Sequence, residues 1–236
     1  MTLRPFSRQF IRGTEVLVWD LDVAEEIAWD ASKVLPAHEV RAALKAGDPV
    51  VRSRRLAGRI LVRRTLSAWM DRRPAELVFE TGPYGKPFLP SGPSFNLSHS
   101  GKYLALGIRP SGRVGIDIEV VRHSPDLPEL AQRYFTESEK KGIADSPDGS
   151  TRAFFRVWVR KEAFLKATGF GLALPLDSFS VSASPLLPGA NAVTAMAVDN
   201  EKERDWLVTS AVAPSNTALA LAVDLPPGQA DPRTPR

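Results

Sequence analysis

The sequence contains no cysteine and only three histidines among its 236 residues. Without cysteine, the chain has no disulfide framework, no thiolate metal ligand and no cysteine nucleophile. It also lacks a G-x-S-x-G motif and a pair of histidines at metal-ligand spacing, which disfavours serine hydrolases and zinc enzymes. Any chemistry must therefore use carboxylates, amines, hydroxyls or a bound cofactor.

No apolar run approaches the roughly 20 residues that a membrane-spanning helix needs, and the N-terminal segment lacks the apolar centre of a signal peptide. We therefore expect a cytoplasmic protein with no membrane contact. The chain is 43% hydrophobic and 25% charged, as in ordinary globular proteins. Its net charge of +4 favours acidic partners, although a solvated arginine-rich surface would give the same excess.

Residues 114–121, with the sequence VGIDIEVV, place two carboxylates in an otherwise apolar strand. Because strand side chains alternate, Gly115, Asp117 and Glu119 share one face. At a rise of roughly 3.3 Å per residue, the Cα atoms of the two acids lie about 6.6 Å apart, so both carboxylates can reach one cation. Gly115 would leave room beside them for a ligand. The alternative is an amphipathic strand whose polar face is simply exposed to water.

A second polar group lies in the predicted helix 154–168, which Gly169 would terminate. Trp158, Glu162 and Lys166 are spaced four residues apart and form one stripe of this helix. A carboxylate and an ammonium one turn apart indicate a partly buried polar site, or else an ordinary Glu–Lys helix pair. The G-x-G at 169–171 has no third glycine at the required spacing, so it does not indicate a nucleotide loop.

Residues 94–101 resemble a short strand that runs into a loop of small polar residues, which can donate hydrogen bonds to phosphate oxygens. His99 could add a further donor, although a lone histidine is more often structural. Lys86 follows a tight turn at residues 82–85 and could also meet a ligand. The run 103–108 and the turn at 110–112 predict a hairpin with the acidic strand.

The remaining patterns predict an α+β fold with two similar lobes, residues 1–112 and 113–225, and a disordered tail at 226–236. The first lobe should contain a strand at 15–22, then helices from residue 24, from Pro36 and from Pro49. The last helix is rich in arginine, which indicates either an anion-binding face or a solvated one. A capping box at Thr136 and Glu139 should begin a short helix in the second lobe. Four strand-like runs follow, at residues 177–183, 192–199, 206–213 and 217–224.

Three separated segments, FNLSHSG (95–101), VGIDIE (114–119) and VWVRKEAFLKATGFGLALPLDSFSV (157–181), together resemble 4′-phosphopantetheinyl transferases of the surfactin-synthetase type. The segments PYGKP (83–87) and RRLAGRILVRR (54–64) are also similar to that family. The resemblance implies two α+β lobes related by a pseudo-twofold axis, each a mostly antiparallel sheet packed with helices. It further implies coenzyme A and Mg²⁺, or Mn²⁺ in its place, in a cleft between the lobes.

The same resemblance implies that Asp117, Glu119 and Glu162 hold the metal ion. Glu162 or a metal-bound water would deprotonate the incoming serine of the carrier protein, and Lys166 would steady the diphosphate or the leaving group. The positions implied to bind coenzyme A are Arg41, Arg54, Lys86, Ser98, His99 and Lys161. At one residue before Glu162, however, Lys161 should point away from the catalytic stripe. The sequence has His38 where the family commonly has a lysine for the 3′-phosphate.

The implied reaction transfers phosphopantetheine from coenzyme A to a serine of an acyl or peptidyl carrier protein and releases adenosine 3′,5′-bisphosphate. We expect a monomer with no nucleic-acid partner. One alternative is a metal-dependent nucleotide phosphohydrolase, which would also need acids and basic residues. Another is a non-catalytic module that binds coenzyme A or a carrier protein. The presence of both strand acids, Glu162 and Lys166 argues against the latter.

Overall fold

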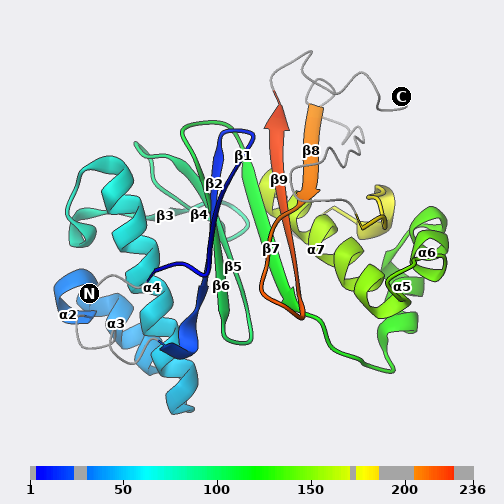
Figure 1. Ribbon diagram of the computed structural model, residues 1–236. Coiled ribbons are helices and arrows are strands. Elements are labelled where there is room, and N and C mark those ends of the chain that lie inside the picture. Colours follow the sequence, from blue (N-terminus) through cyan, green and yellow to red (C-terminus); the bar gives the residue numbers. More distant parts are fainter. Residues whose placement is uncertain (1–3, 24–30, 171–173, 186–204, 226–236) are drawn as a thin grey trace.

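The computed structural model describes residues 4–23, 31–170, 174–185 and 205–225. Within these ranges the chain forms two antiparallel sheets, a short two-stranded hairpin and helices that pack on the outer faces of the sheets (Figure 1). The predicted α+β class with mostly antiparallel strands is therefore confirmed. No helix of the described ranges is long and apolar enough to cross a membrane.

The first sheet combines two strands from the N-terminal 20 residues with two strands from residues 94–109. Its order is β1 (Ser7–Ile11), β2 (Thr14–Asp20), β6 (Tyr103–Arg109) and β5 (Ser94–Ser100). Gly101, at φ 57°, lies in the turn that joins β5 to β6 in a hairpin. The strand predicted at residues 15–22 is confirmed as β2, whereas β1 was not predicted.

The second sheet contains the acidic strand at one edge. Its order is β7 (Val114–Val120), β9 (Thr217–Leu225) and β8 (Asp205–Ser210). The predicted hairpin between residues 103–108 and the acidic strand is wrong, because β6 pairs with β2 and β5 while β7 pairs with β9. The turn after β6 instead carries the chain to the other sheet. The register of Asp117 is set by Ala220, its partner in β9.

The two sheets face each other across an apolar layer. Its buried members include Val16, Val18, Ala105, Val114, Ile116, Ile118, Leu219 and Leu221. Ile116 and Ile118 are fully buried, and each contributes about 1.5–3 kcal/mol of transfer free energy. This alternate-residue burial fixes which face of β7 carries the acids, because a slip of one residue would bury the carboxylates in the apolar layer.

Helices cover the outer face of each sheet (Figure 1). Beside the first sheet lie α2 (Ala31–Val34), α3 (Ala37–Leu44) and α4 (Pro49–Met70). Beside the second lie α5 (Leu127–Tyr134), α6 (Glu137–Ala144) and α7 (Ser150–Thr168). Short 3₁₀ helices span Leu21–Val23, Pro74–Glu76 and Leu176–Ser178.

Several predicted helix boundaries are confirmed. Pro36 precedes α3, Pro49 begins α4, and Thr136 with Glu139 forms the capping box of α6. Gly169, at φ 78°, ends α7 in a left-handed conformation that glycine adopts without strain. The predicted helix start at residue 24, the run 192–199 and the tail 226–236 lie outside the described residues.

The strand predicted at residues 177–183 is wrong. A 3₁₀ helix, Leu176–Ser178, is followed there by irregular chain. The backbone N–H of Val181 donates to Glu139 Oε1 at 2.7 Å. A side chain of α6 thus takes a donor that a neighbouring strand would otherwise use.

The short hairpin of β3 (Glu80–Thr81) and β4 (Pro87–Phe88) contains the turn predicted at residues 82–85. The Gly82 N–H donates to the Lys86 carbonyl at 2.9 Å, and Gly85 has a φ of 82°. This turn closes the hairpin directly before Lys86.

Candidate active site

The acidic strand β7 points Gly115, Asp117 and Glu119 away from the apolar layer between the sheets, as the alternation predicts. Gly115, however, leaves no room for a ligand. A Cβ atom at this position would lie 2.0 Å from the Ala163 carbonyl oxygen of α7. The missing side chain instead allows α7 to pack directly on β7, which brings the polar residues of that helix close to the strand acids.

Asp117 is almost completely buried, with 3% of its surface exposed. Its Oδ1 atom accepts hydrogen bonds from Lys166 Nζ at 2.6 Å and from Ser98 Oγ at 2.8 Å. Its Oδ2 atom is buried and accepts no hydrogen bond from any residue that the structure describes. Burial raises the pKa of Asp117, and the positive charge of Lys166 opposes that shift.

The other two acids belong to the same electrostatic environment. Glu119 Oε2 accepts a hydrogen bond from Ser100 Oγ at 2.6 Å. Burial raises the pKa of Glu162 on α7, and the negative charges of Asp117 and Glu119 raise it further. Even so, within the described part of the chain no three His, Cys, Asp or Glu side chains are gathered closely enough to hold a metal ion. Asp117, Glu119 and Glu162 lie close enough to affect one another electrostatically, but in this structure their carboxylates do not surround a common point.

A cleft of about 240 Å³ opens beside these acids. Its lining includes Glu162 and Lys166 from α7, Asn96 from β5, and Tyr84 and Lys86 from the β3–β4 hairpin. Two elements from the first half of the chain and one helix from the second thus meet around one polar space. The Glu162 and Lys166 side chains, which the sequence placed on one helix stripe, both face it.

Lys86 is held by backbone carbonyls at the edge of this cleft. Its Nζ atom donates to the carbonyl oxygens of Val114 at 2.8 Å and Lys166 at 2.6 Å. Burial, with a smaller contribution from the positive charge of Arg113, lowers the pKa of Lys86 to about 8. Lys166 lies in the last turn of α7, so Lys86 satisfies one of the free carbonyls at the end of that helix.

A second cavity, of about 560 Å³, lies between α4 and β5. Its wall contains four arginines of α4, together with His99 and apolar side chains such as Phe95 and Leu97. The four are Arg54, Arg55, Arg59 and Arg63, and we call this space the arginine-rich cavity. Arg54 is also paired with Asp22, at 2.6 Å between Nη2 and Oδ1. His99 and Ser98 point to opposite faces of β5, so this single strand separates the cavity from the acids.

Comparison with known proteins identifies this arrangement. The model of the 4′-phosphopantetheinyl transferase superfamily matches residues 113–222. The 4′-phosphopantetheinyl transferase HetI of Nostoc sp. is 34% identical over 217 residues, which cover 89% of this chain and 87% of that protein. This chain belongs to the 4′-phosphopantetheinyl transferase superfamily.

Two further relatives agree with this assignment. The 4′-phosphopantetheinyl transferase Sfp of Bacillus subtilis is 40% identical over 131 residues, which cover 54% of this chain and 57% of that protein. AcpT of Salmonella typhi is 38% identical over 170 residues, covering 70% of this chain and 82% of that protein. The predicted family and the predicted activity, transfer of phosphopantetheine to a carrier protein, are thereby confirmed. The roles of individual residues stay predictions.

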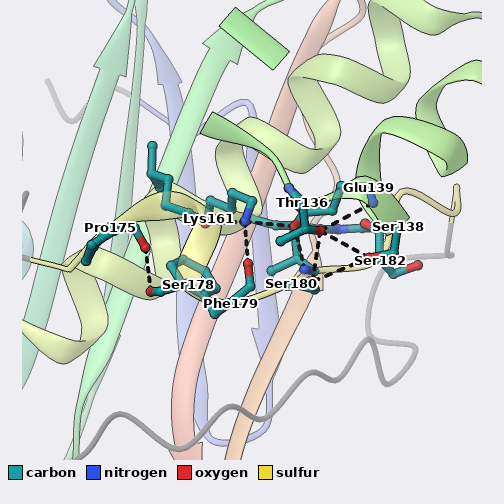
Figure 2. A network of polar contacts seen from close by, with 12 residues as sticks. Thr136, Ser138, Glu139, Lys161, Pro175, Ser178, Phe179, Ser180 and Ser182 are labelled. Atoms are coloured by element: carbon teal, nitrogen blue, oxygen red, sulfur yellow. Dashed lines mark hydrogen bonds and ion pairs between the residues drawn. The ribbon is translucent and has the colours of Figure 1, made fainter. Parts of the chain in front are cut away.

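The structure does not place every predicted coenzyme ligand of this transferase at a cavity. Lys161 is fully buried, and its Nζ atom donates to the carbonyls of Leu176 and Phe179, each at 2.6 Å. It also pairs with Glu139 Oε1 at 2.9 Å in the network of Figure 2. The expectation that Lys161 binds coenzyme A therefore has to be corrected, because its ammonium group has no exposed surface and all its protons are used inside the protein.

Arg41 and His38 also lie outside both cavities of the transferase. Both are exposed residues of α3, and neither belongs to the lining of the cleft or of the arginine-rich cavity. Glu39 of the same helix does line that cavity and bonds Arg63. The expected contact of Arg41 with coenzyme A stays a prediction.

Asn96 and Ser100 contact the acidic strand β7, although sequence reasoning did not single them out. Asn96 Oδ1 accepts a hydrogen bond from the Ile116 N–H at 2.8 Å, and Ser100 bonds Glu119. The sequence did contain a signal for them. Asn96, Ser98 and Ser100 are alternate residues of one segment, so in a strand they would share one polar face. This signal was missed because the strand within residues 94–101 was expected to be short and to run into a loop, whereas β5 continues to Ser100.

Proposed function

We propose that this transferase joins the 4′-phosphopantetheine group of coenzyme A to a serine of an apo acyl or peptidyl carrier protein at the cleft between β5, β7 and α7. The observation that carries the assignment is Asp117 Oδ2, a buried carboxylate oxygen that bonds no described residue. Such an unsatisfied group costs about 1–3 kcal/mol or more, so its presence beside Glu162 and Lys166 indicates that a ligand completes the site.

Coenzyme A is proposed to cross β5. Its nucleotide end would lie in the arginine-rich cavity, where Arg54 and His99 can bond phosphate oxygens and apolar side chains can contact the base. Its diphosphate would lie at the cleft, within reach of Lys166. This path uses the arginine-rich cavity and the cleft, and it explains why positive charge lines the arginine-rich cavity.

The chemistry that we propose needs no covalent intermediate. Glu162 accepts the proton of the carrier serine, and its raised pKa makes it a stronger base than an ordinary glutamate. The serine oxygen then bonds the phosphorus atom that carries the pantetheine arm. The bond from that phosphorus to the leaving phosphate of adenosine 3′,5′-bisphosphate breaks. Lys166, which Asp117 holds at 2.6 Å, stabilises the negative charge that develops there.

Asp117, Glu119 and Glu162 are the residues that would hold Mg²⁺, or Mn²⁺ in its place. Carboxylate oxygens suit these cations, and Asp117 Oδ2 could bind one because no described residue bonds it, although Lys166 occupies Oδ1. Besides burial, the negative charges of Asp117 and Glu119 raise the pKa of Glu162, as expected of a site built for positive charge. When bound, the cation would neutralise charge on the diphosphate.

The proposed partners are coenzyme A and an acidic carrier protein, in keeping with the net charge of +4. All residues of the proposed site come from one chain, so a monomer is expected. Residues 1–112 and 113–225 each supply one antiparallel sheet with helices on its outer face, which supports the proposed pseudo-twofold relation between two lobes.

The direct test incubates the protein with coenzyme A, Mg²⁺ and several apo-carrier proteins. Intact-protein mass spectrometry should show a gain of one phosphopantetheine on the carrier serine. Release of phosphate from simple nucleotides without carrier modification would favour a phosphohydrolase instead. Binding of coenzyme A with neither product would indicate a non-catalytic module.

A further inference from the structure

Strands β5 and β7 lie at neighbouring sheet edges but share no backbone ladder, because β5 pairs with β6 and β7 pairs with β9. Side chains of β5 make the connection instead. Asn96 bonds the Ile116 N–H at 2.8 Å, Ser98 bonds Asp117 at 2.8 Å, and Ser100 bonds Glu119 at 2.6 Å. Alternate residues of β5 thus bond Ile116, Asp117 and Glu119 of β7 in order along the strand, and two of the three contacts are made to acids of the site.

The direction of these hydrogen bonds is fixed by a second partner at each serine. Ser100 Oγ accepts from the Val120 N–H at 3.1 Å, and Ser98 Oγ accepts from Lys166 Nζ at 3.0 Å. A serine hydroxyl has only one proton to donate. The proton of Ser100 is therefore directed to Glu119, and the proton of Ser98 to Asp117.

Each serine occupies one oxygen of its acid and leaves the other available. At Asp117 the bonded atom is Oδ1, while Oδ2 is the buried oxygen that no described residue bonds. At Glu119 the bonded atom is Oε2. A carboxylate held by one oxygen has its rotamer fixed, and its second oxygen points in a defined direction.

We propose that Ser98 and Ser100 are positioning residues that hold Asp117 and Glu119 so that one oxygen of each is presented to a divalent cation. The proposal rests on the proposed function, because it concerns the cation of that site. It also gives Ser98 a role different from the expected contact with a coenzyme phosphate, since the only proton of Ser98 is already donated to Asp117.

Ser100 offers the sharper test, because it lines neither the cleft nor the arginine-rich cavity. Threonine and valine have nearly the same shape and both suit a strand, but only threonine keeps the hydroxyl. Ser100→Thr and Ser100→Val therefore form a matched pair. Ser67→Ala serves as the control, since the hydroxyl of this buried serine donates to the Arg64 carbonyl within α4, on the outer face of the other sheet.

The experiment counts free Mn²⁺ by electron paramagnetic resonance in the presence of coenzyme A and also records thermal unfolding and the KM for coenzyme A. We expect Ser100→Val to weaken Mn²⁺ binding about 10–100-fold relative to the parent. Ser100→Thr should bind within about threefold of the parent, Ser67→Ala should not differ from it, and the KM for coenzyme A, measured at saturating Mn²⁺, should be unchanged in all of them.

Equal Mn²⁺ affinity of Ser100→Val and Ser100→Thr would overturn the proposal, even if the valine variant melts earlier, because the hydroxyl would then serve only to join the strands. If Ser100→Val does not fold, Ser100→Ala is measured in its place against the same threonine variant. If the two variants bind Mn²⁺ equally well and the parent still modifies carriers, the positioning role is overturned and the proposed function stands. A parent that neither binds Mn²⁺ nor modifies any carrier overturns both proposals.

Discussion

Helix α7 carries two lysine–carboxylate pairs, and they differ in how completely they are bonded. Lys161 and Glu139 are both buried, and the lysine uses its three protons on two carbonyls and on Glu139 Oε1. Glu139 in turn accepts from backbone N–H groups at both of its oxygens. Lys166 and Asp117 form a shorter ion pair, at 2.6 Å against 2.9 Å for Lys161 and Glu139, but Asp117 Oδ2 has no partner among the described residues.

The difference follows from helix geometry. Lys161 and Lys166 are five residues apart, which places them about 140° apart around the helix axis. Lys161 therefore points toward the chain at residues 176–181, whose carbonyls satisfy it, and Lys166 points toward β7 and the cleft. The complete pair, Lys161 and Glu139, joins α6, α7 and the segment that follows α7. We propose that the incomplete pair, Lys166 and Asp117, is available to a ligand.

Removing charge from the incomplete pair should have the largest effect on turnover. Asp117→Asn is expected to lower kcat by about a thousandfold, equivalent to about 4 kcal/mol of transition-state stabilisation. The free energy of unfolding should stay within about 1 kcal/mol of the parent or rise, because burial already disfavours the charged Asp117. Carrier-modification kinetics and urea unfolding check the two parts. Glu137→Gln, at an exposed glutamate of α6, is the control.

Near-normal turnover of Asp117→Asn would contradict the assignment of this acid to the site. A loss of stability as large as that of a core substitution would instead make the pair structural, like Lys161 and Glu139.

Breaking the complete pair should show the opposite pattern. Lys161→Met leaves Glu139 buried without its cation and is expected to cost about 3–5 kcal/mol of stability. Turnover per folded molecule should stay within about threefold of the parent. Adding Glu139→Leu to Lys161→Met should recover part of the lost stability, measured by urea unfolding of both single variants and the double variant. Strict additivity of the two single losses would show that the ion pair is not the interaction being broken.

A third lysine sharpens the comparison, because Lys86 also bonds two carbonyls but makes no ion pair within the described part of the chain. Its pKa of about 8 lies below the ordinary value of 10.5, so between these two pH values the unfolded chain holds a proton that the folded chain has released. Stability should therefore rise with pH in this window, by up to about 3 kcal/mol. Urea unfolding from pH 7.5 to 10.5 should show a steeper rise in stability in the parent than in Lys86→Met, in which only the other buried cations with lowered pKa values, such as Arg160, still contribute. Parallel slopes would contradict the lowered pKa.

The smallest expected effect concerns the lysine of the incomplete pair. Lys166→Met removes the charge that opposes the raised pKa of Asp117 and is expected to lower kcat about 10–100-fold. Lys166→Arg keeps the charge and should retain more activity. The KM for coenzyme A and kcat are measured for both variants at saturating Mg²⁺. Equal loss in both would mean that the shape of the lysine, and not its charge, matters.

Local features of the fold could be predicted from the sequence, because they depend on nearby residues. The capping box at Thr136, the end of α7 at Gly169 and the alternation around Asp117 are examples. The partner of β7 could not be predicted, since β9 lies far along the chain and the turn at 110–112 favours a hairpin that does not form.

The same reason applies to the site. The sequence placed Glu162 and Lys166 on one stripe of α7, and both line the cleft. It also indicated that Lys161 points elsewhere, but the buried Glu139 that receives it is far from it in sequence. The role of Gly115 was misjudged because only the packed structure shows the backbone of α7 in the space that a side chain would need.

The most direct test of the central claim is an anomalous diffraction measurement on crystals that contain Mn²⁺ and coenzyme A. The account predicts a manganese peak within bonding distance of Asp117 Oδ2, with Glu119 or Glu162 among its other ligands and with the Lys161–Glu139 pair unchanged. A manganese peak elsewhere, or none near Asp117 in crystals whose coenzyme A is well ordered, would contradict it.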